Sequence, residues 1–184
     1  MNIKENQRFQ QTHTQIMDTL IHLLKEKDLK QISVSEICRE VHINRSTFYE
    51  HFVDVYDLMQ KIEKDMSKEL KDCYQQGMMV SNKEAFLNLF CYVRKKKKFY
   101  SVYLGQGNML PITGELLGAD FQRDGATLAE IRWITSQVQL DYHLDFFRAG
   151  INAIIRHWLD RDCAESPDEL YDILEKEYQS TPNT

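Results

Sequence analysis

The polar side chains of residues 44–51 are the group in this chain best suited to chemical recognition. The run contains Asn44, Arg45, Ser46, Thr47, Tyr49 and His51. An arginine guanidinium can make a forked hydrogen bond to a guanine edge or to a phosphate, and hydroxyl groups suit either target. Phe48 and Phe52 lie four residues apart and give the same segment one apolar face. We therefore expect the polar groups to point to solvent, where they can contact nucleic acid.

Two short helices joined by a tight turn are expected to position these groups. Ser33 can cap the backbone of Glu36, and the Glu36 side chain can reach back to Ser33, which predicts a helix that begins at Ser33. Asn44 is suited to cap a second helix over residues 45–51. A pair of helices at this spacing, with the second polar on its outer face, is typical of a helix-turn-helix. The second helix of that motif fits the DNA major groove.

Both helices of this motif are expected to contact DNA. The second helix would reach the base edges from its first residues, while the first helix would brace against the phosphates. Backbone amides at the two helix starts add the positive ends of helix dipoles, which favour phosphate. The predicted DNA contacts are Ser33, Ser35, Asn44, Arg45, Ser46, Thr47, Tyr49 and His51.

The other elements predicted from the sequence are helices as well. Apolar periodicity predicts them over residues 6–27, from 54 into the seventies, and over 83–94, 99–104 and 135–159. Ser166 and Glu169 form a second capping box with Pro167 at the first helical position, which predicts a last helix up to residue 178. Residues 105–125 hold five glycines and Pro111 and are expected to be irregular. The predicted fold is all-α, with a three-helix DNA-binding domain at residues 1–53 and a helical dimerisation and effector-binding domain at residues 54–184.

Several functional classes are not supported by the sequence. No stretch approaches the roughly 18 uninterrupted apolar residues of a membrane span, and the polar start does not resemble a secretion signal, so we expect a cytoplasmic protein. The four cysteines lack a C-x-x-C pair and are expected to be reduced. His143 and His157 would stand about 20 Å apart on one helix and cannot share an ion. Without a nucleophile–base motif or a phosphate loop, we expect no enzyme, metal or cofactor.

The charge of the chain is the observation least favourable to DNA binding. The net charge is −5, but residues 1–52 hold seven basic and seven acidic residues, whereas residues 161–184 hold two and seven. The acidity therefore lies at the far end, and the predicted DNA-binding domain is neutral rather than basic. The basic run at residues 94–98 is interpreted as a solvated helix end, because it lies far in sequence from residues 44–51.

The helix predicted over residues 135–159 has apolar residues on more of its circumference than one core requires. Its second face implies a partner, and a two-fold dimer would present two DNA-binding domains to a palindromic site. The predicted dimer interface is Phe146, Gly150, Ala153 and His157. A pocket for a small apolar effector is a further hypothesis, although core packing is the simpler explanation for each aromatic residue. The predicted lining is Phe86, Phe90, Tyr103, Trp133 and Phe147.

Residues 34–58, VSEICREVHINRSTFYEHFVDVYDL, resemble the DNA-binding domain of the TetR family of regulators. Tyr49, Phe52 and Leu58 match that family's aromatic pair and the leucine that follows. Residues 147–159, FRAGINAIIRHWL, and 165–170, ESPDEL, are similar to the C-terminal domain common in Firmicutes members. The resemblance implies a homodimeric, sequence-specific regulator that binds a palindromic operator in double-stranded DNA. It also implies a repressor that a small-molecule effector releases from the operator; the alternatives are an activator, or control through a protein partner instead of a small molecule.

Two residues depart from the family pattern. His42 stands where the family usually has glycine in the turn, so it must accept a left-handed backbone or shift the turn. Val55 stands where the family usually has a lysine that contacts phosphate, which predicts weaker and less salt-dependent binding. These positions support the alternative hypothesis of a helical interaction module or co-regulator that has this fold but does not bind DNA.

Overall fold

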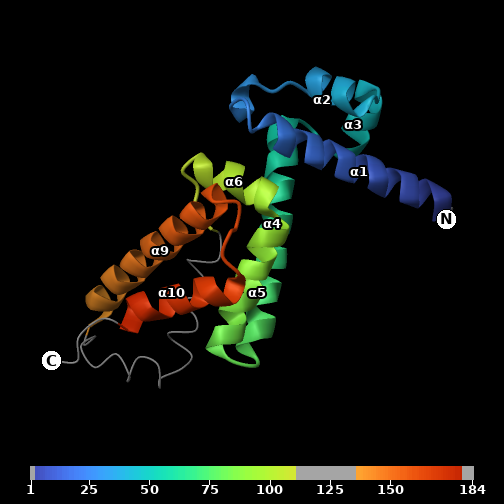
Figure 1. The fold of residues 1–184 in the computed structure, drawn as a ribbon. Coiled ribbons are helices and arrows are strands. Elements are labelled where there is room, and N and C mark those ends of the chain that lie inside the picture. The colour runs from blue at the N-terminus through green and yellow to red at the C-terminus, as the bar shows by residue number, and fades with distance from the viewer. Residues whose placement is uncertain (1–2, 111–135, 180–184) are drawn as a thin grey trace. The chain divides into compact units, whose positions relative to one another are not determined.

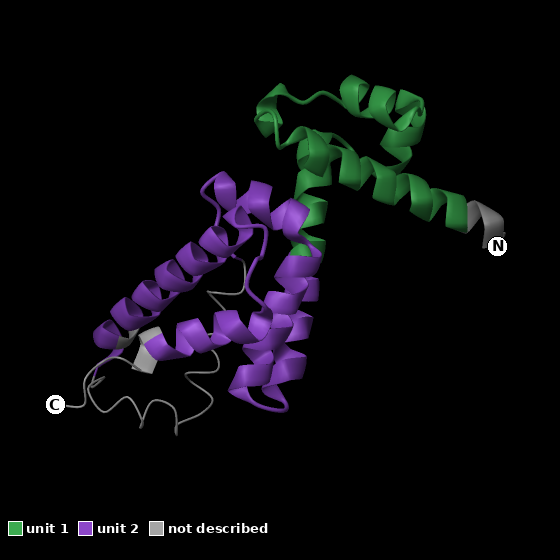
Figure 2. Ribbon diagram, in the orientation of Figure 1, with its two compact units in different colours: residues 1–66 green, residues 67–184 purple. Residues whose placement is uncertain are grey.

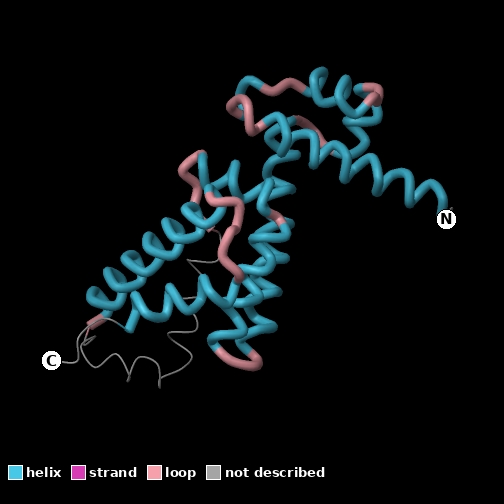
Figure 3. Tube along the Cα trace, viewed as in Figure 1, coloured by secondary structure: helices cyan, strands magenta, loops and turns pink. Residues whose placement is uncertain are grey.

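The computed structural model describes residues 3–110 and 136–179, and every regular element within them is a helix. Figure 3 shows the described helices in cyan and the described loops and turns in pink. The chain forms two compact units, Met1–Met66 and Ser67–Thr184 (Figure 2). The predicted all-α fold is confirmed. Of the segment expected to be irregular, residues 111–125 lie outside the described residues, as does Trp133.

The first unit contains α1 (Ile3–Leu23), the 3-10 helix η1 (Leu29–Gln31), α2 (Val34–Val41) and α3 (Arg45–His51). It also includes the first half of α4 (Val55–Met78), which is labelled in Figure 1 and changes colour between the two units in Figure 2. The apolar stripes of these helices face one another because each helix has hydrophobic residues on one side only. The fully buried residues at the centre are Ile16, Leu20, Ile37, Phe48, Leu58 and Ile62.

The first unit extends beyond the predicted domain of residues 1–53. Val55, Leu58, Met59, Ile62 and Met66 are buried along the first half of α4. This part of α4 supplies apolar surface that the unit needs, because α2 and α3 are short and small domains bury a limited fraction of their surface.

The second unit contains the rest of α4, α5 (Asn82–Lys95), α6 (Lys97–Gly105), α9 (Gln137–Asp160) and α10 (Pro167–Gln179). Helices α6 and α9 pack together, and so do α5 and α10 (Figure 1). The core of this unit is aromatic, and its largest fully buried side chains are Tyr74, Phe90, Tyr100 and Trp158. No helix among the described residues is long and apolar enough to span a membrane.

The start of α10 has the capping box predicted from the sequence. The Ser166 backbone amide donates to Glu169 Oε2 at 2.8 Å, and the Glu169 amide donates to Ser166 Oγ at 3.2 Å. Just before it, the indole nitrogen of Trp158 donates to the backbone oxygen of Glu165 at 3.0 Å. These bonds fix the connection between α9 and α10, because they satisfy polar groups that a helix end leaves unpaired.

Candidate nucleic-acid interface

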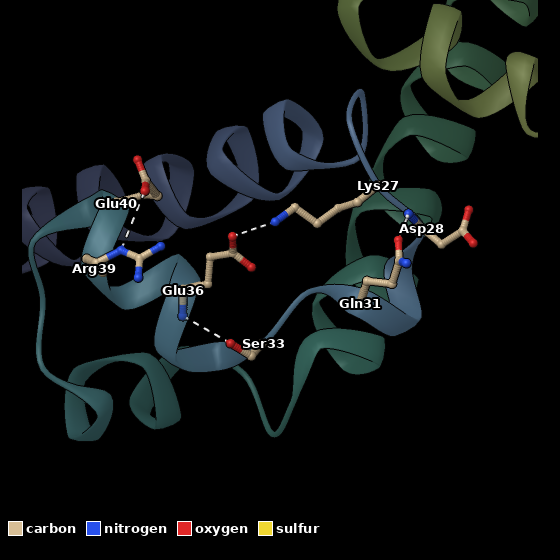
Figure 4. Close-up of polar contacts among 7 residues, drawn as sticks. All are labelled: Lys27, Asp28, Gln31, Ser33, Glu36, Arg39 and Glu40. Carbon is tan, nitrogen blue, oxygen red and sulfur yellow. Dashed lines mark hydrogen bonds and ion pairs between the residues drawn. The ribbon is translucent and has the colours of Figure 1, made fainter.

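Helix α2 is held at its start by Ser33 and by an ion pair. Ser33 Oγ accepts a hydrogen bond from the Glu36 backbone amide at 3.2 Å, as predicted. The Glu36 carboxylate does not reach back to Ser33: it accepts from Lys27 Nζ at 2.6 Å instead (Figure 4). This hydrogen bond to Lys27 holds the pKa of Glu36 below its ordinary value. Half of the predicted capping box is therefore replaced by an ion pair that ties the segment after α1 to α2.

The turn between α2 and α3 contains a left-handed residue. His42 has φ 60° and ψ 44°, and its amide donates to the backbone oxygen of Arg39 at 3.3 Å. The next amide, of Ile43, donates to the Cys38 oxygen at 3.0 Å. Left-handed geometry is the common way to end a helix, and glycine is its preferred residue. Of the two outcomes expected for His42, the chain adopts the strained backbone and keeps the turn.

Arg45 joins the two helices of the motif. It is the first residue of α3, and its Nη2 donates to Ser35 Oγ on α2 at 2.5 Å. Both side chains are exposed. The bond limits the number of conformations that the long arginine side chain samples, so less entropy is lost when it binds a target. Two of the predicted DNA contacts are thus brought together on one surface.

The exposed and inner faces of α3 are clearly separated. Phe48 is fully buried, while Thr47 and His51 are half-buried on the same side of the helix. The exposed side chains from the cap residue onward are Asn44, Arg45, Ser46, Tyr49 and Glu50. Asn44 occupies the cap position but makes no capping hydrogen bond with its side chain, contrary to our expectation. Its amide therefore remains free for another partner.

Glu50 is a member of this exposed face that the sequence analysis did not include. The residues expected to contact DNA were hydrogen-bond donors and hydroxyl groups, because these suit phosphate and a carboxylate does not. The signal that could have identified Glu50 is its position four residues after Ser46, which places both on one side of a helix.

His51 packs inside the unit rather than pointing outward with Tyr49. Its ring centroid lies 3.9 Å from that of Phe9 and 5.4 Å from that of His13, both on α1. Burial lowers the pKa of both histidines; Lys61 lowers that of His13 further, and His13 lowers that of His51. Asp65 opposes the shift in His13 and Glu50 the shift in His51. The geometry favours a packing role for His51, and we no longer propose it as a direct DNA contact.

Neither histidine is held by a hydrogen bond at Nδ1. Within the part of the chain that the structure describes, the buried Nδ1 atoms of His13 and His51 have no partner. A buried polar atom without a partner is costly, and the cost increases when the ring takes up a proton. The contact between α1 and α3 is therefore sensitive to protonation.

Val55 is buried, with 6% of its surface exposed. The position where the resemblance implies a phosphate-binding lysine thus contributes to the core instead. The start of α4 is ordered by its carboxylates: the Asp57 amide donates to Asp54 Oδ1, and the Val53 amide donates to Asp57 Oδ2, both at 2.8 Å. The exposed residues beside Val55 are Val53, Asp54 and Tyr56, none of which is a cation that could replace the lysine.

In the second unit, the four residues predicted at a dimer interface lie along one side of α9. Phe146, Ala153 and His157 are exposed and Gly150 is half-buried. Their spacing of three or four residues places them on one stripe. The stripe continues toward the start of α9 through Val138 and Tyr142, with exposed fractions of 62% and 75%; Phe146 reaches 78%. The buried residues Leu144, Ile151, Ile155 and Trp158 are on the opposite side.

An open groove borders this stripe. It has a volume of about 570 Å³ and is lined by Ala153 and His157 of α9 and by Leu170 and Ile173 of α10, among others. Ile173 is 46% exposed. The exposed apolar stripe and the groove together form one surface of α9 and α10, which we call the α9–α10 face.

The residues predicted to line an effector pocket divide into two groups. Phe86 and Phe90 are buried, and Phe86 lies 6.1 Å from Phe90 and 6.3 Å from Phe147 between ring centroids. Tyr103 instead stacks on Phe99 at 5.1 Å. In the described part of the chain, three of the five residues therefore form one aromatic cluster, in which Phe86 and Phe90 are buried and Phe147 is half-buried.

Known proteins resemble both units. Residues 16–62 match the tetR family of bacterial regulatory proteins, and residues 81–178 match the family described as transcriptional regulator C-terminal region. The uncharacterized HTH-type transcriptional regulator YxbF of Bacillus subtilis (strain 168) is 24% identical over 163 residues. That match covers 85% of this chain but only 42% of YxbF.

Solved structures share the fold over nearly the whole chain. A TetR transcriptional regulator from Streptococcus agalactiae 2603V has a TM-score of 0.58 at 19% identity, covering 93% of this chain and 95% of the other. The fatty acid degradation regulator FadR from Bacillus halodurans has a TM-score of 0.64 at 15% identity, covering 94% and 96%. The helix-turn-helix and the helical second unit define a transcriptional regulator. More specifically, the chain belongs to the TetR family, as its resemblance implied.

Proposed function

We propose that this protein is a homodimeric repressor that binds a palindromic operator through α3 and is released by a small apolar effector. The observation that carries the DNA-binding part is the exposed face of α3, with Arg45 held against Ser35 at 2.5 Å. The face offers one guanidinium, one amide and two hydroxyl groups to the major groove, from Arg45, Asn44, Ser46 and Tyr49. Ser33 and Ser35 add hydroxyl groups from α2 that suit phosphate.

Base contacts must carry much of the specificity, because the first unit has little positive charge. The buried Val55 removes one cation from the position that the family uses for phosphate. Fewer phosphate contacts mean that fewer counterions are released, so affinity depends less on salt. Thr47 is half-buried beside this face and is proposed as a marginal contact only.

The experiment that tests DNA binding is selection of duplexes from a random library by the purified protein at moderate salt. Enrichment of a palindrome is expected. Arg45→Ala should abolish the preferred sequence without lowering the thermal midpoint, since its side chain is exposed. Arg39→Ala is the matched control: Arg39 is an exposed arginine of α2 that lies 3.8 Å from Glu40, and it should keep the wild-type motif. Absence of any enriched sequence would favour the interaction module instead.

The homodimer is proposed on the α9–α10 face. Single exposed apolar residues are common, but a continuous stripe with a bordering groove marks an interaction surface. A two-fold interface uses the same surface of both subunits, so a self-complementary stripe such as this one suits it. Phe146, Gly150, Ala153 and His157 are the residues proposed to meet their counterparts in the partner subunit.

The effector is proposed to act on the second unit through the aromatic cluster of Phe86, Phe90 and Phe147. Phenylalanine rings can repack around an apolar molecule, because their side chains have no polar group whose hydrogen bond must be broken. Release then follows if the molecule binds a dimer conformation with low DNA affinity more tightly. Titration of apolar compounds against the protein–operator complex tests this. A compound that lowers the affinity for the operator by a given factor should bind the protein–operator complex more weakly than the free protein by the same factor.

A further inference from the structure

Glu50 is the one carboxylate on the exposed face of α3. It shares that face with Ser46 and Tyr49, the residues proposed above to reach the bases. The inference drawn here therefore rests on the proposed DNA binding through α3. A carboxylate in this position is unfavourable next to phosphates, because both groups are negative.

Within the described residues, the Glu50 carboxylate has one electrostatic interaction, with the half-buried His51 ring. Among the described residues, none makes a hydrogen bond or an ion pair with it. The residues three and four positions away on either side are Ser46, Thr47, Val53 and Asp54, none of which is a cation. Glu50 is thus not part of a stabilising pair along the helix surface. Its carboxylate is fully available to a ligand that approaches α3.

The major groove limits what this carboxylate can bind. An ionised carboxylate only accepts hydrogen bonds, so it needs a donor. The donors that bases present in the major groove are exocyclic amino groups, N4 of cytosine and N6 of adenine. Adenine places an acceptor, N7, beside its amino group, which repels a second carboxylate oxygen, whereas cytosine N4 has no adjacent acceptor on its own base.

We propose that Glu50 determines sequence specificity by accepting a hydrogen bond from the N4 amino group of a cytosine in the operator. Guanine and thymine offer the carboxylate no donor in the major groove, and at adenine the neighbouring N7 repels it, so binding at these bases is weaker. The same residue reduces non-specific binding, since its charge repels the DNA backbone wherever the cytosine is absent. Specificity thus comes from a repulsive group that only one base compensates.

The test is a parallel selection from a random duplex library with the wild type, Glu50→Ala and Glu50→Gln. The wild type should enrich a motif with a conserved cytosine in each half-site. Glu50→Ala should lose the preference at that position, reducing the discrimination roughly tenfold, and should bind random DNA more tightly. Glu50→Gln should shift the preference to adenine, because a glutamine amide pairs with adenine N6 and N7.

Glu40→Gln is the matched control. Glu40 is an exposed carboxylate of α2 in the same unit, so the substitution makes the same change of charge. It should raise affinity for all sequences without changing the motif. If Glu50→Ala enriches the same motif as the wild type, or if the preference it loses is for adenine, the assignment is wrong while the proposed function stands. If the wild type enriches no DNA sequence, both the assignment of Glu50 to cytosine and the proposed DNA-binding function are overturned.

Discussion

His42 combines a residue type and a backbone conformation that rarely occur together. Its φ of 60° lies in the left-handed region, which costs a residue with a Cβ atom about 1–2 kcal/mol relative to its ordinary conformation. Glycine avoids this cost but loses more freedom on folding. The turn it completes lies directly before Arg45, so the strain is carried by the segment that orients α3.

We expect His42→Gly to stabilise the protein by about 0.5–1 kcal/mol, because relief of the strain exceeds the added entropy of the unfolded chain. The measurement is the urea midpoint, with His42→Ala as the control, since alanine keeps the Cβ atom and gains nothing. Operator binding should be unchanged. If His42→Gly is instead destabilised, the exposed imidazole makes a stabilising contact that outweighs the relief of backbone strain.

The paired imidazoles of His13 and His51 predict a dependence of stability on pH. Burial lowers the pKa of both in the folded protein below the ordinary value of 6.5. Well above pH 6.5 both imidazoles are neutral in the folded and unfolded states, and their full contribution to the free energy of unfolding is present. As the pH falls below 6.5 the unfolded chain takes up protons first, so stability decreases until the lowered pKa values are reached.

The urea midpoint should therefore fall as the pH is lowered from about 7.5 to about 5.5. His51→Phe keeps an aromatic ring beside Phe9 and should flatten this decrease. His22→Gln, which changes an exposed histidine in the last turn of α1, is the control and should keep it. An equally steep decrease in His51→Phe would assign the effect to other groups.

At the scale of elements, α4 and α5 lie close together at Gly77. A Cβ atom placed there would lie 2.4 Å from the Ala85 Cα atom, which is backbone and cannot turn aside. Gly77→Ala should force the two helices apart and destabilise the protein by about 1–3 kcal/mol. Gly105→Ala, at the end of α6, meets nothing within 4 Å and is the control. Both are checked by thermal unfolding.

Helices could be predicted from the sequence far better than the faces they present. The helix over residues 45–51 was predicted with the bounds that α3 has, because its cap and its apolar pair are local signals. The inner position of His51 depends on Phe9 and His13, more than thirty residues earlier. Local periodicity does not contain such a contact. Glu36 shows the same limit, since Lys27 competes for its carboxylate from outside the helix.

At the scale of the whole molecule, the charge of the first unit makes dimerisation important for DNA binding, because residues 1–66 hold nine Lys/Arg and eleven Asp/Glu, a net charge of −2. One unit offers few cations for phosphate, so its non-specific attraction to DNA is small. In a dimer joined through the second units, the two first units bind the two halves of a palindrome together. Once the first half-site is bound, binding of the second is intramolecular, so the affinity for the palindrome greatly exceeds that for one half-site. The proposed α9–α10 face would therefore control operator affinity without touching DNA.

Phe146→Glu tests this arrangement, because a two-fold interface places the new carboxylate at both copies of the same position. Burial of unpaired charges should weaken dimerisation by at least roughly a hundredfold. Sedimentation at micromolar concentration should show a dimer for the wild type and a monomer for the variant. Met79→Glu is the control: Met79 is 87% exposed in the turn after α4, is not part of the α9–α10 face, and its variant should remain a dimer.

Operator binding by the Phe146→Glu variant separates the dimer from the DNA-binding unit. The monomer keeps the exposed face of α3, so it should bind a single half-site as weakly as the wild-type unit does. It should lose the extra affinity of the palindrome, because each half-site is then occupied independently. The variant could instead sediment as a monomer and still bind the palindrome as tightly as the wild type. In that case the first units, and not the α9–α10 face, would couple binding at the two half-sites. A wild type that is monomeric at these concentrations would remove the α9–α10 face as the site of dimerisation.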